Sequence, residues 1–400
     1  MANFYLPDDA NQQIYLDANA TTPVLPEIAD VVSHTMRVCF GNPSSSHITG
    51  IQAKHLLEQT RNKAREVIGA TDGDILFTSG ATEGIQTAVV STLIAAKNHP
   101  IENPVLLYGA TEHKAVPNTL KHWNSVLDIN AQVLAIPVDK NGILDHEFIR
   151  KHAANALMIC TMAVNNETGV FQDLIAIEQV IRSENTHVAW MVDCVQALGK
   201  TNLALSQTTI DYAPFSGHKL YAPKGIGVLY IREGSAYTPF IAGGGQESGM
   251  RSGTENLPGI AGLNKLFSLL LDKQNQTFKP IEQLHAYREQ LLGALTDTFG
   301  SITFNHSFEH SVPTTLNFAV NELTSKEVMD FREATGEEAL WTNSMFSGMP
   351  AYQISTKTNA NLMQYVFKVI TFGMPRPASF LFLYLLGFYI LLLSIKIDYR

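Results

Sequence analysis

Short apolar runs alternate with longer amphipathic segments through the first two thirds of the chain. The amphipathic segments place apolar residues three and four positions apart, which is typical of helices, whereas the short bounded runs are typical of buried strands. Strands that alternate with helices indicate crossover units, and therefore an α/β fold with a mainly parallel sheet flanked by helices. The predicted helices cover residues 51–68, 83–97 and 174–183, and the predicted strands cover residues 14–17, 74–77, 105–108, 133–136, 156–160, 188–192 and 228–231.

The pattern changes in the C-terminal part of the chain. An amphipathic helix at residues 281–299 is followed by short strands at 302–304 and 315–318, as expected for a smaller second domain. Further on, residues 378–395 form an unbroken uncharged run rich in Leu and Phe. This run is at the lower length limit for a helix that spans a membrane, so it is a candidate membrane tether.

Polar residues follow directly after several of the predicted strands: His113, Asn166, Asp193, Gln196 and Lys219. In mainly parallel sheets the ligand lies beyond the carboxyl ends of the strands. A single histidine or aspartate at such a place is more often a helix cap or a satisfied core group. The shared placement of all of them predicts a ligand site at this edge of the sheet.

Lys219 lies between the polar residues Ser216 and His218 and an apolar run. Burial disfavours the ammonium form of a lysine and lowers its pKa, and a neutral amine can form a Schiff base with a carbonyl group. Ser216 and His218 are short polar donors of the kind that hold a phosphate. A lysine beside phosphate donors suggests pyridoxal phosphate as the cofactor, and the alternative is an ordinary surface lysine at a strand edge.

Residues 78–82 form a Ser/Thr/Gly turn between a predicted strand and a predicted helix. The start of a helix presents free backbone N–H groups and the positive end of the helix dipole, so it can bind an anion. The dipole contributes only about 0.3–1 kcal/mol at an exposed site, and the hydroxyls of Ser79 and Thr82 can add hydrogen bonds. The simpler interpretation of this turn is a helix cap.

Asp193 is the most informative partner for Lys219. Pyridoxal phosphate acts as an electron sink when its ring nitrogen is protonated, and a nearby carboxylate stabilises that charge. His113 can stack on the cofactor ring or relay protons, and its alternative role is structural.

The composition excludes several classes of protein. The net charge of -9 and the absence of basic runs argue against a nucleic-acid partner. The cysteines Cys39, Cys160 and Cys194 are too few and too scattered for a disulfide framework or a zinc site, and they fit a reducing compartment. Residues 1–16 contain two aspartates and no apolar core, so we expect no signal peptide and a cytoplasmic location for residues 1–330.

Several ordered motifs between residues 14 and 330 together resemble the cysteine desulfurases of the NifS/IscS kind, which belong to the class V aminotransferases. They include IYLDANATTPV, ILFTSGATEG, TEHKAV, SGHKLYAPKGIGVLY and GGGQESGMRSGTENLPGIAG. The resemblance implies the type I pyridoxal-phosphate-dependent transferase fold and a homodimer. It also implies conversion of L-cysteine to L-alanine, with sulfur transfer to a thiol and then to a sulfur-acceptor protein.

The resemblance also implies a role for each site residue. Lys219 matches the Schiff-base lysine, Asp193 the partner of the pyridinium nitrogen, and His113 the ring-stacking histidine. The other matched positions contact the cofactor or its phosphate, with the last reaching it from the second subunit: Asn166, Gln196, Ala81, Thr82, Ser216, His218 and Thr254.

The family pattern stops after about residue 330. Family members continue with a loop that carries the catalytic cysteine, roughly where residues 341–347 stand here, and later with an arginine for the substrate carboxylate; neither is present. We therefore predict a cofactor-binding large domain at 15–262, a truncated small domain from 1–14 and 263–330, and an unrelated tail at 331–377. The tail and the apolar run after it resemble part of large multi-spanning bacterial membrane proteins of the YfhO type.

Three hypotheses for the function remain open. The first is a cysteine desulfurase that is impaired because it lacks the cysteine loop. The second is a fusion protein that binds pyridoxal phosphate without catalysis. The third is a class V lyase that acts on another amino acid and needs no cysteine nucleophile.

Overall fold

The computed structural model describes residues 15–299 and 302–320, all of which belong to one compact unit of the chain. The predicted tail at 331–377 and the apolar run at 378–395 lie outside the described residues. Within the described ranges, no helix is both long and apolar enough to cross a membrane.

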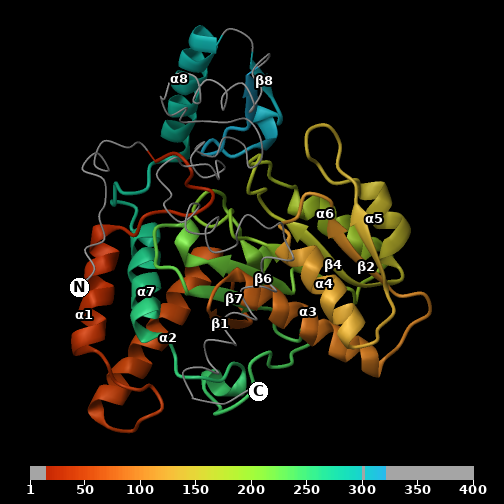
Figure 1. The fold of residues 1–400 in the computed structure, drawn as a ribbon. Helices are drawn as coiled ribbons and strands as arrows, with labels where there is room; N and C mark the ends of the chain where they lie inside the picture. Colours follow the sequence, from red (N-terminus) through yellow and green to blue (C-terminus); the bar gives the residue numbers. More distant parts are fainter. Residues whose placement is uncertain (1–14, 300–301, 321–400) are drawn as a thin grey trace, which may run out of the picture. The chain divides into compact units, whose positions relative to one another are not determined.

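A seven-stranded sheet forms the centre of this unit, in the order β1-β7-β6-β5-β4-β2-β3 (Figure 1). All neighbouring strands are parallel except at β7, which is antiparallel to both β6 and β1. The predicted mainly parallel sheet is therefore confirmed. The strands are β1 (Asp74–Thr78), β2 (Val105–Gly109), β3 (Gln132–Ile136), β4 (Ala156–Met162), β5 (Ala189–Asp193), β6 (Tyr212–Ser216) and β7 (Gly227–Ile231).

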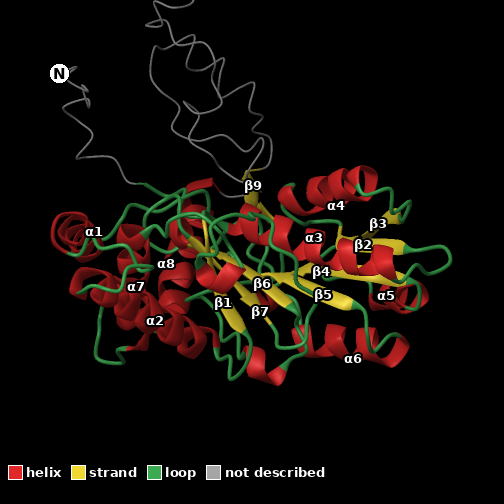
Figure 2. Ribbon diagram, turned by 90° about the horizontal axis from the view of Figure 1, so that it is seen from below, coloured by secondary structure: helices red, strands yellow, loops and turns green. Residues whose placement is uncertain are grey.

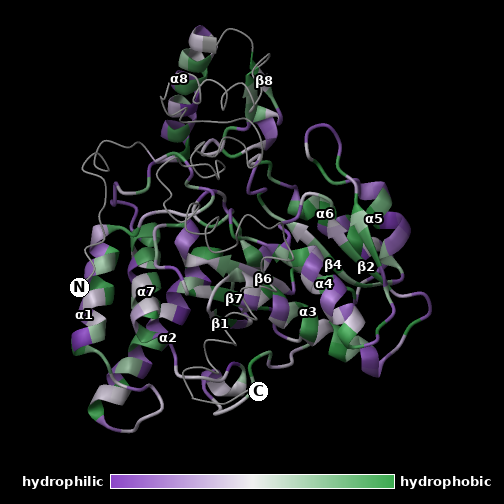
Figure 3. Ribbon diagram, viewed as in Figure 1, coloured by the Kyte–Doolittle hydropathy of each residue, from purple (hydrophilic) through white to green (hydrophobic). Residues whose placement is uncertain are grey.

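Helices cover both faces of the sheet (Figure 2). The helices are α1 (Pro26–Val38), α2 (Ile48–Ile68), α3 (Ala81–Asn98), α4 (Ala115–Val126), α5 (His146–Ala153), α6 (Leu174–Glu184) and α7 (Leu257–Leu271). Apolar residues of α3 and α4 pack in one buried cluster, and those of α1, α2, α5, α6 and α7 pack in the other. The central strands are correspondingly apolar (Figure 3), since a strand covered on both faces has no polar side.

A smaller group of elements follows α7. It contains α8 (Ile281–Phe299) and the antiparallel pair β8 (Ile302–Phe304) and β9 (Phe318–Val320). An isolated bridge joins Val170, in the loop after β4, to Ser311. Helix α8 has the predicted bounds, whereas β9 begins three residues later than the start predicted at residue 315, because residues 315–317 are irregular.

The strand predicted at residues 14–17 is wrong over the part that the structure describes. Residues 15–17 are irregular and lead into a turn. The hydroxyl of Tyr15 donates hydrogen bonds to the carbonyl oxygens of Asp17 and Thr21, so this segment folds on itself instead of pairing with the sheet.

Candidate active site

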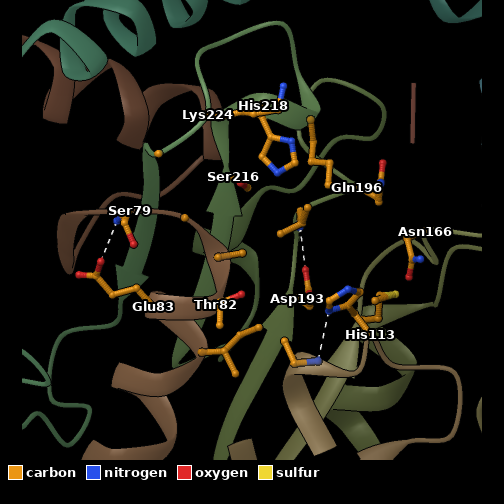
Figure 4. Close-up of a pocket in the computed structure, with 18 residues that line it drawn as sticks. Ser79, Thr82, Glu83, His113, Asn166, Asp193, Gln196, Ser216, His218 and Lys224 are labelled. Carbon is orange, nitrogen blue, oxygen red and sulfur yellow. Dashed lines mark hydrogen bonds between the residues drawn. The ribbon is translucent and has the colours of Figure 1, made fainter. Parts of the chain in front are cut away.

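A cavity of about 540 Å³ lies at the carboxyl ends of the parallel strands (Figure 4). Thr254 is exposed and does not line this cavity. The other predicted site residues all line it: Ala81, Thr82, His113, Asn166, Asp193, Gln196, Ser216, His218 and Lys219. The prediction that these residues lie together at this edge of the sheet is therefore confirmed for their positions.

The sheet topology explains this convergence. Asp193 is the last residue of β5, and Lys219 ends a short 3-10 turn directly after β6. Strands β5 and β6 are parallel neighbours, so both side chains emerge at the same edge. His113 and Asn166 follow β2 and β4, which are also parallel neighbours in the sheet.

Asp193 is a buried carboxylate whose side chain borders the cavity. Burial raises its pKa, while the hydrogen bond from the Val195 N–H and the nearby His113 and Lys219 oppose that change. The Val195 N–H lies 2.9 Å from Asp193 Oδ1. A buried carboxyl that faces a cavity in this way can stabilise a positive charge on a ligand.

His113 is oriented by its own loop. The backbone N–H of Ala115 donates to His113 Nδ1 over 3.2 Å. In the neutral ring this contact leaves the proton on Nε2. The imidazole therefore presents a fixed edge to the cavity, next to Asp193 (Figure 4).

Lys219 is held by the N-terminal segment. Its Nζ donates to the main-chain carbonyl oxygens of Asn19 at 2.7 Å and Ala20 at 2.9 Å. Burial lowers the pKa of Lys219, although the charges of Asp193 and Asp17 act in the opposite direction. The lowered pKa was predicted from the sequence, and it favours the neutral, nucleophilic amine.

A second set of contacts converges on Asn19. Gln196 Nε2 donates to the Asn19 carbonyl oxygen at 2.9 Å, and Lys200 Nζ donates to both Gln196 Oε1 and Asn19 Oδ1. Burial and the charge of Lys219 lower the pKa of Lys200 to about 8. Asn19 and Lys200 were not predicted from the sequence. Asn19 accepts these bonds largely through its main-chain oxygen, which no side-chain pattern reveals, and Lys200 lies well beyond the end of β5.

The wall opposite Asp193 is the start of α3. This helix begins at Ala81 without a side-chain cap at Gly80, and its first backbone N–H groups have no partner within the helix. Ser79, Gly80, Ala81 and Thr82 all line the cavity. The helix start therefore offers backbone donors and the positive end of the dipole to an anion.

Ser216 and His218 complete this wall. His218 Nδ1 lies 3.1 Å from the hydroxyl of Thr21, and burial lowers the pKa of the imidazole, with Lys219 and Lys224 adding to the effect. Gly227 allows β7 to pass close to the turn, because a Cβ there would lie 2.7 Å from Gly80 Cα. Backbone packing thus fixes the turn at residues 78–82 against β6 and β7.

Two charged residues of this wall were not predicted. Glu83 lines the cavity from the first turn of α3, and Lys224 lines it from the loop before β7. Glu83 could have been recognised from its place three residues after the helix N-cap, where Glu commonly reaches back to a backbone N–H. Lys224 could have been recognised from its closeness to Lys219 in the chain.

None of the three cysteines lines the cavity. Cys160 and Cys194 are fully buried, and burial raises the pKa of both thiols well above the usual value, with a nearby carboxyl adding to the effect. The place of Cys39 beside an apolar segment of the sequence predicts a buried thiol, and the structure contradicts this prediction. Cys39 follows the last residue of α1 and is half-buried, because the chain leaves the helix there for an open loop.

The sequence matches the profile of the aminotransferase class-V family over residues 14–337. The chain belongs to this family. Cysteine desulfurase IscS of Escherichia coli O139:H28 (strain E24377A / ETEC) is 34% identical over 322 residues, which is 79% of this chain and 77% of that protein.

Solved structures agree with this assignment. A structure described as a NifS-like protein has a TM-score of 0.71 and 31% identity and covers 81% of this chain and 86% of its own. A structure described as SspA in complex with cysteine has a TM-score of 0.68 and 28% identity and covers 81% of this chain and 88% of its own. The central fold is therefore the type I fold of this family.

Members of this family are transferases that depend on pyridoxal phosphate. The cavity fits this cofactor in its donor set. It offers an amine of lowered pKa, a buried carboxylate suited to a protonated ring nitrogen, and an uncapped helix start suited to a phosphate.

Proposed function

We propose that this chain binds pyridoxal phosphate through Lys219 and acts on L-cysteine or a similar amino acid. The observation that carries the proposal is the pairing of Lys219 and Asp193 at the ends of neighbouring parallel strands, facing one cavity. An uncapped helix start on the same cavity supplies the place for the phosphate. The similarity to a desulfurase sequence and to a relative solved with cysteine supports this substrate class.

Each residue has a separate task in this proposal. Lys219 would supply the amine that holds the cofactor, and Asp193 would stabilise the positive ring nitrogen. His113 would pack against the ring, and Asn166 and Gln196 would contact its edge. The phosphate would be held by four residues that line the cavity, Ala81, Thr82, Ser216 and His218.

The cofactor, when bound, withdraws electrons from the bonds at the substrate α-carbon. The chain itself must then move the α-proton. Lys219 is suited to this because its lowered pKa leaves more of the amine neutral at a given pH. His113 lines the same cavity, and with its proton on Nε2 it is suited to donating a proton to the substrate rather than removing one.

Sulfur transfer is the step for which the chain lacks a residue. Such a step needs a thiolate that can reach the substrate sulfur. The chain has no cysteine after Cys194, and the thiols of Cys160 and Cys194 are buried with raised pKa values. We therefore infer that this chain is an impaired desulfurase. For the same reason, the second candidate is a protein that binds the cofactor but does not turn over cysteine. A lyase that acts on another amino acid is the third, because it would need no thiol.

We also propose that the protein is a homodimer. Thr254 is exposed and lies outside the cavity of its own subunit, so it is free to reach the phosphate in the partner. Sedimentation should give a dimer, and Thr254→Ala should weaken cofactor binding without changing the dimer. A tether through residues 378–395 remains a further proposal, which fractionation of membranes from expressing cells would test.

Borohydride reduction of the protein with pyridoxal phosphate, followed by peptide mapping, tests the central proposal. We expect the label on Lys219 and no label in Lys219→Ala, while Lys224→Ala, which removes another lysine of the cavity, keeps it. A label on another residue, or none, would contradict the proposal. Release of alanine and sulfide from cysteine then separates a working desulfurase from the two alternatives.

A further inference from the structure

The side chain of Glu83, in the first turn of α3, is hydrogen-bonded to the turn at residues 78–82 that leads into the helix. Glu83 occupies the third position of α3, and its side chain is only 7% exposed. Its Oε2 accepts the backbone N–H of Ser79 at 2.8 Å, so the carboxylate turns back along the helix start (Figure 4). This contact fixes the backbone that presents the free N–H groups to the cavity.

Arg251 holds the same carboxylate from a loop far along the chain. Arg251 Nε donates to Glu83 Oε1 at 2.9 Å, and the terminal guanidinium nitrogen donates to Oε2 at 3.3 Å. This two-point contact is the geometry in which Arg binds carboxylates most strongly. Burial raises the pKa of Glu83, but the hydrogen bonds from Arg251 and Ser79 outweigh it and leave the pKa below the ordinary value. Glu83 is therefore ionised.

An ionised carboxylate at this place opposes anion binding unless its charge is cancelled. The start of α3 attracts anions through its N–H groups and its dipole, and a phosphate monoester adds roughly 1.5–2 negative charges there. Glu83 lines the same cavity and would repel that group. Arg251 does not line the cavity, so its guanidinium acts through Glu83.

We propose that Arg251 and Glu83 are positioning residues for the phosphate end of the ligand. Glu83 fixes the turn, and Arg251 both orients Glu83 and cancels its charge. The proposal rests on the proposed function, because it assumes a ligand that carries a phosphate. Its consequence is selectivity: the pair should affect the binding of a phosphorylated ligand and leave the same ligand without the phosphate unaffected.

Binding of pyridoxal phosphate and of pyridoxal, which lacks the phosphate, tests this selectivity. Dissociation constants are measured from the absorbance change of the full chain. We expect Arg251→Gln to weaken pyridoxal phosphate roughly tenfold to a hundredfold, as for the loss of a charged hydrogen-bonded pair, and to leave pyridoxal unchanged. Adding Glu83→Gln to Arg251→Gln removes the uncompensated charge and should restore most of the affinity for pyridoxal phosphate.

Arg182→Gln is the matched control. Arg182 forms a similarly buried ion pair with Asp211, and neither residue lines the cavity. This variant should lose thermal stability without changing the ratio of the two dissociation constants. If Arg251→Gln cannot be purified, Arg251→Lys, which keeps the charge but not the two-point contact, should still weaken pyridoxal phosphate selectively.

The proposal would be overturned if the Arg251 variants lost affinity for both compounds equally, or if the double variant did not regain affinity for pyridoxal phosphate. The pair would then be only a structural contact. Wild-type protein that binds neither compound would instead contradict the proposed function, and the inference with it. The two failures are therefore distinguishable in the same titrations.

Discussion

Lys219 Nζ lies 2.7 Å from the main-chain carbonyl oxygen of Asn19, a residue 200 positions earlier in the chain. Thr22, in the same N-terminal segment, donates both its backbone N–H and its hydroxyl to the carbonyl oxygen of His218. The segment is thus attached to the lysine and to the residue before it. A lysine held by backbone carbonyls on an ordered segment has a defined amine position, which a reactive amine requires.

The first prediction concerns the pH at which this amine reacts. Burial lowers the pKa of Lys219 below the ordinary value of 10.5, so the neutral amine is populated at lower pH than in a free lysine. Covalent attachment of pyridoxal phosphate should increase with pH and reach its midpoint below 10.5. Absorbance titration measures the midpoint, and Lys219→Ala gives the background. A midpoint at or above 10.5 would argue that the amine is fully solvated.

The second prediction concerns Asp193. Asp193→Asn should leave pyridoxal phosphate attached to Lys219 but slow α-proton exchange of a bound amino acid at least about tenfold, because the ring nitrogen loses its negative partner. Exchange is measured by NMR in deuterated buffer. Asp173→Asn is a suitable control, since Asp173 caps α6 and Asn caps helices equally well. Unchanged exchange in Asp193→Asn would remove Asp193 from the proposed mechanism.

The third prediction uses Glu112, whose Oε2 is buried with no hydrogen-bond partner. Burial raises its pKa well above 4.5, and the charge of Asp193 adds to the effect. A carboxyl whose pKa rises on folding costs stability above its unfolded pKa and costs nothing below it. Glu112→Gln should therefore be about 1–3 kcal/mol more stable than the wild type at neutral pH, with the difference vanishing below about pH 4.5.

Chemical denaturation of the cofactor-free protein at several pH values measures this difference. Glu147→Gln is the control, because Glu147 is a mostly exposed residue of α5 and its removal should change stability little at any pH. A Glu112→Gln variant that is less stable than the wild type at neutral pH would show that the ionised carboxylate has a partner in solution.

The sequence predicted most strands of the sheet well because each contains a short bounded apolar run. This holds even for the edge strand β3, which is only partly buried. The run at 74–77 corresponds to β1, and that at 133–136 to β3, within one residue at each end. Helix α1 was missed although Pro26 at its first turn is a recognised start signal. The segment is amphipathic, and its Ile28 is buried in the core, so the signal was present in the sequence and was overlooked.

The predicted site residues other than Thr254 share one property, which is their place at or just after the end of a strand or at the start of α3. That rule finds Asp193 and Lys219 because strand direction alone brings them together. It cannot find Asn19, which acts through its main-chain carbonyl, or Arg251, which acts through Glu83. Contacts of these two kinds depend on tertiary packing between distant segments, and no local pattern encodes them.

The last prediction is that this chain is a poor cysteine desulfurase. The attacking thiolate must travel to the bound substrate, and a free cysteine has a pKa of about 8.5 that the site must match or lower. Burial instead raises the pKa of Cys160 and Cys194, and Cys39, the one half-buried thiol, lies outside the cavity. The protein loaded with pyridoxal phosphate and supplied with cysteine should therefore release little alanine or sulfide. Robust turnover that Cys39→Ser abolishes would make Cys39 the nucleophile, whereas robust turnover that survives replacement of all three cysteines would show that the chemistry needs no protein thiol.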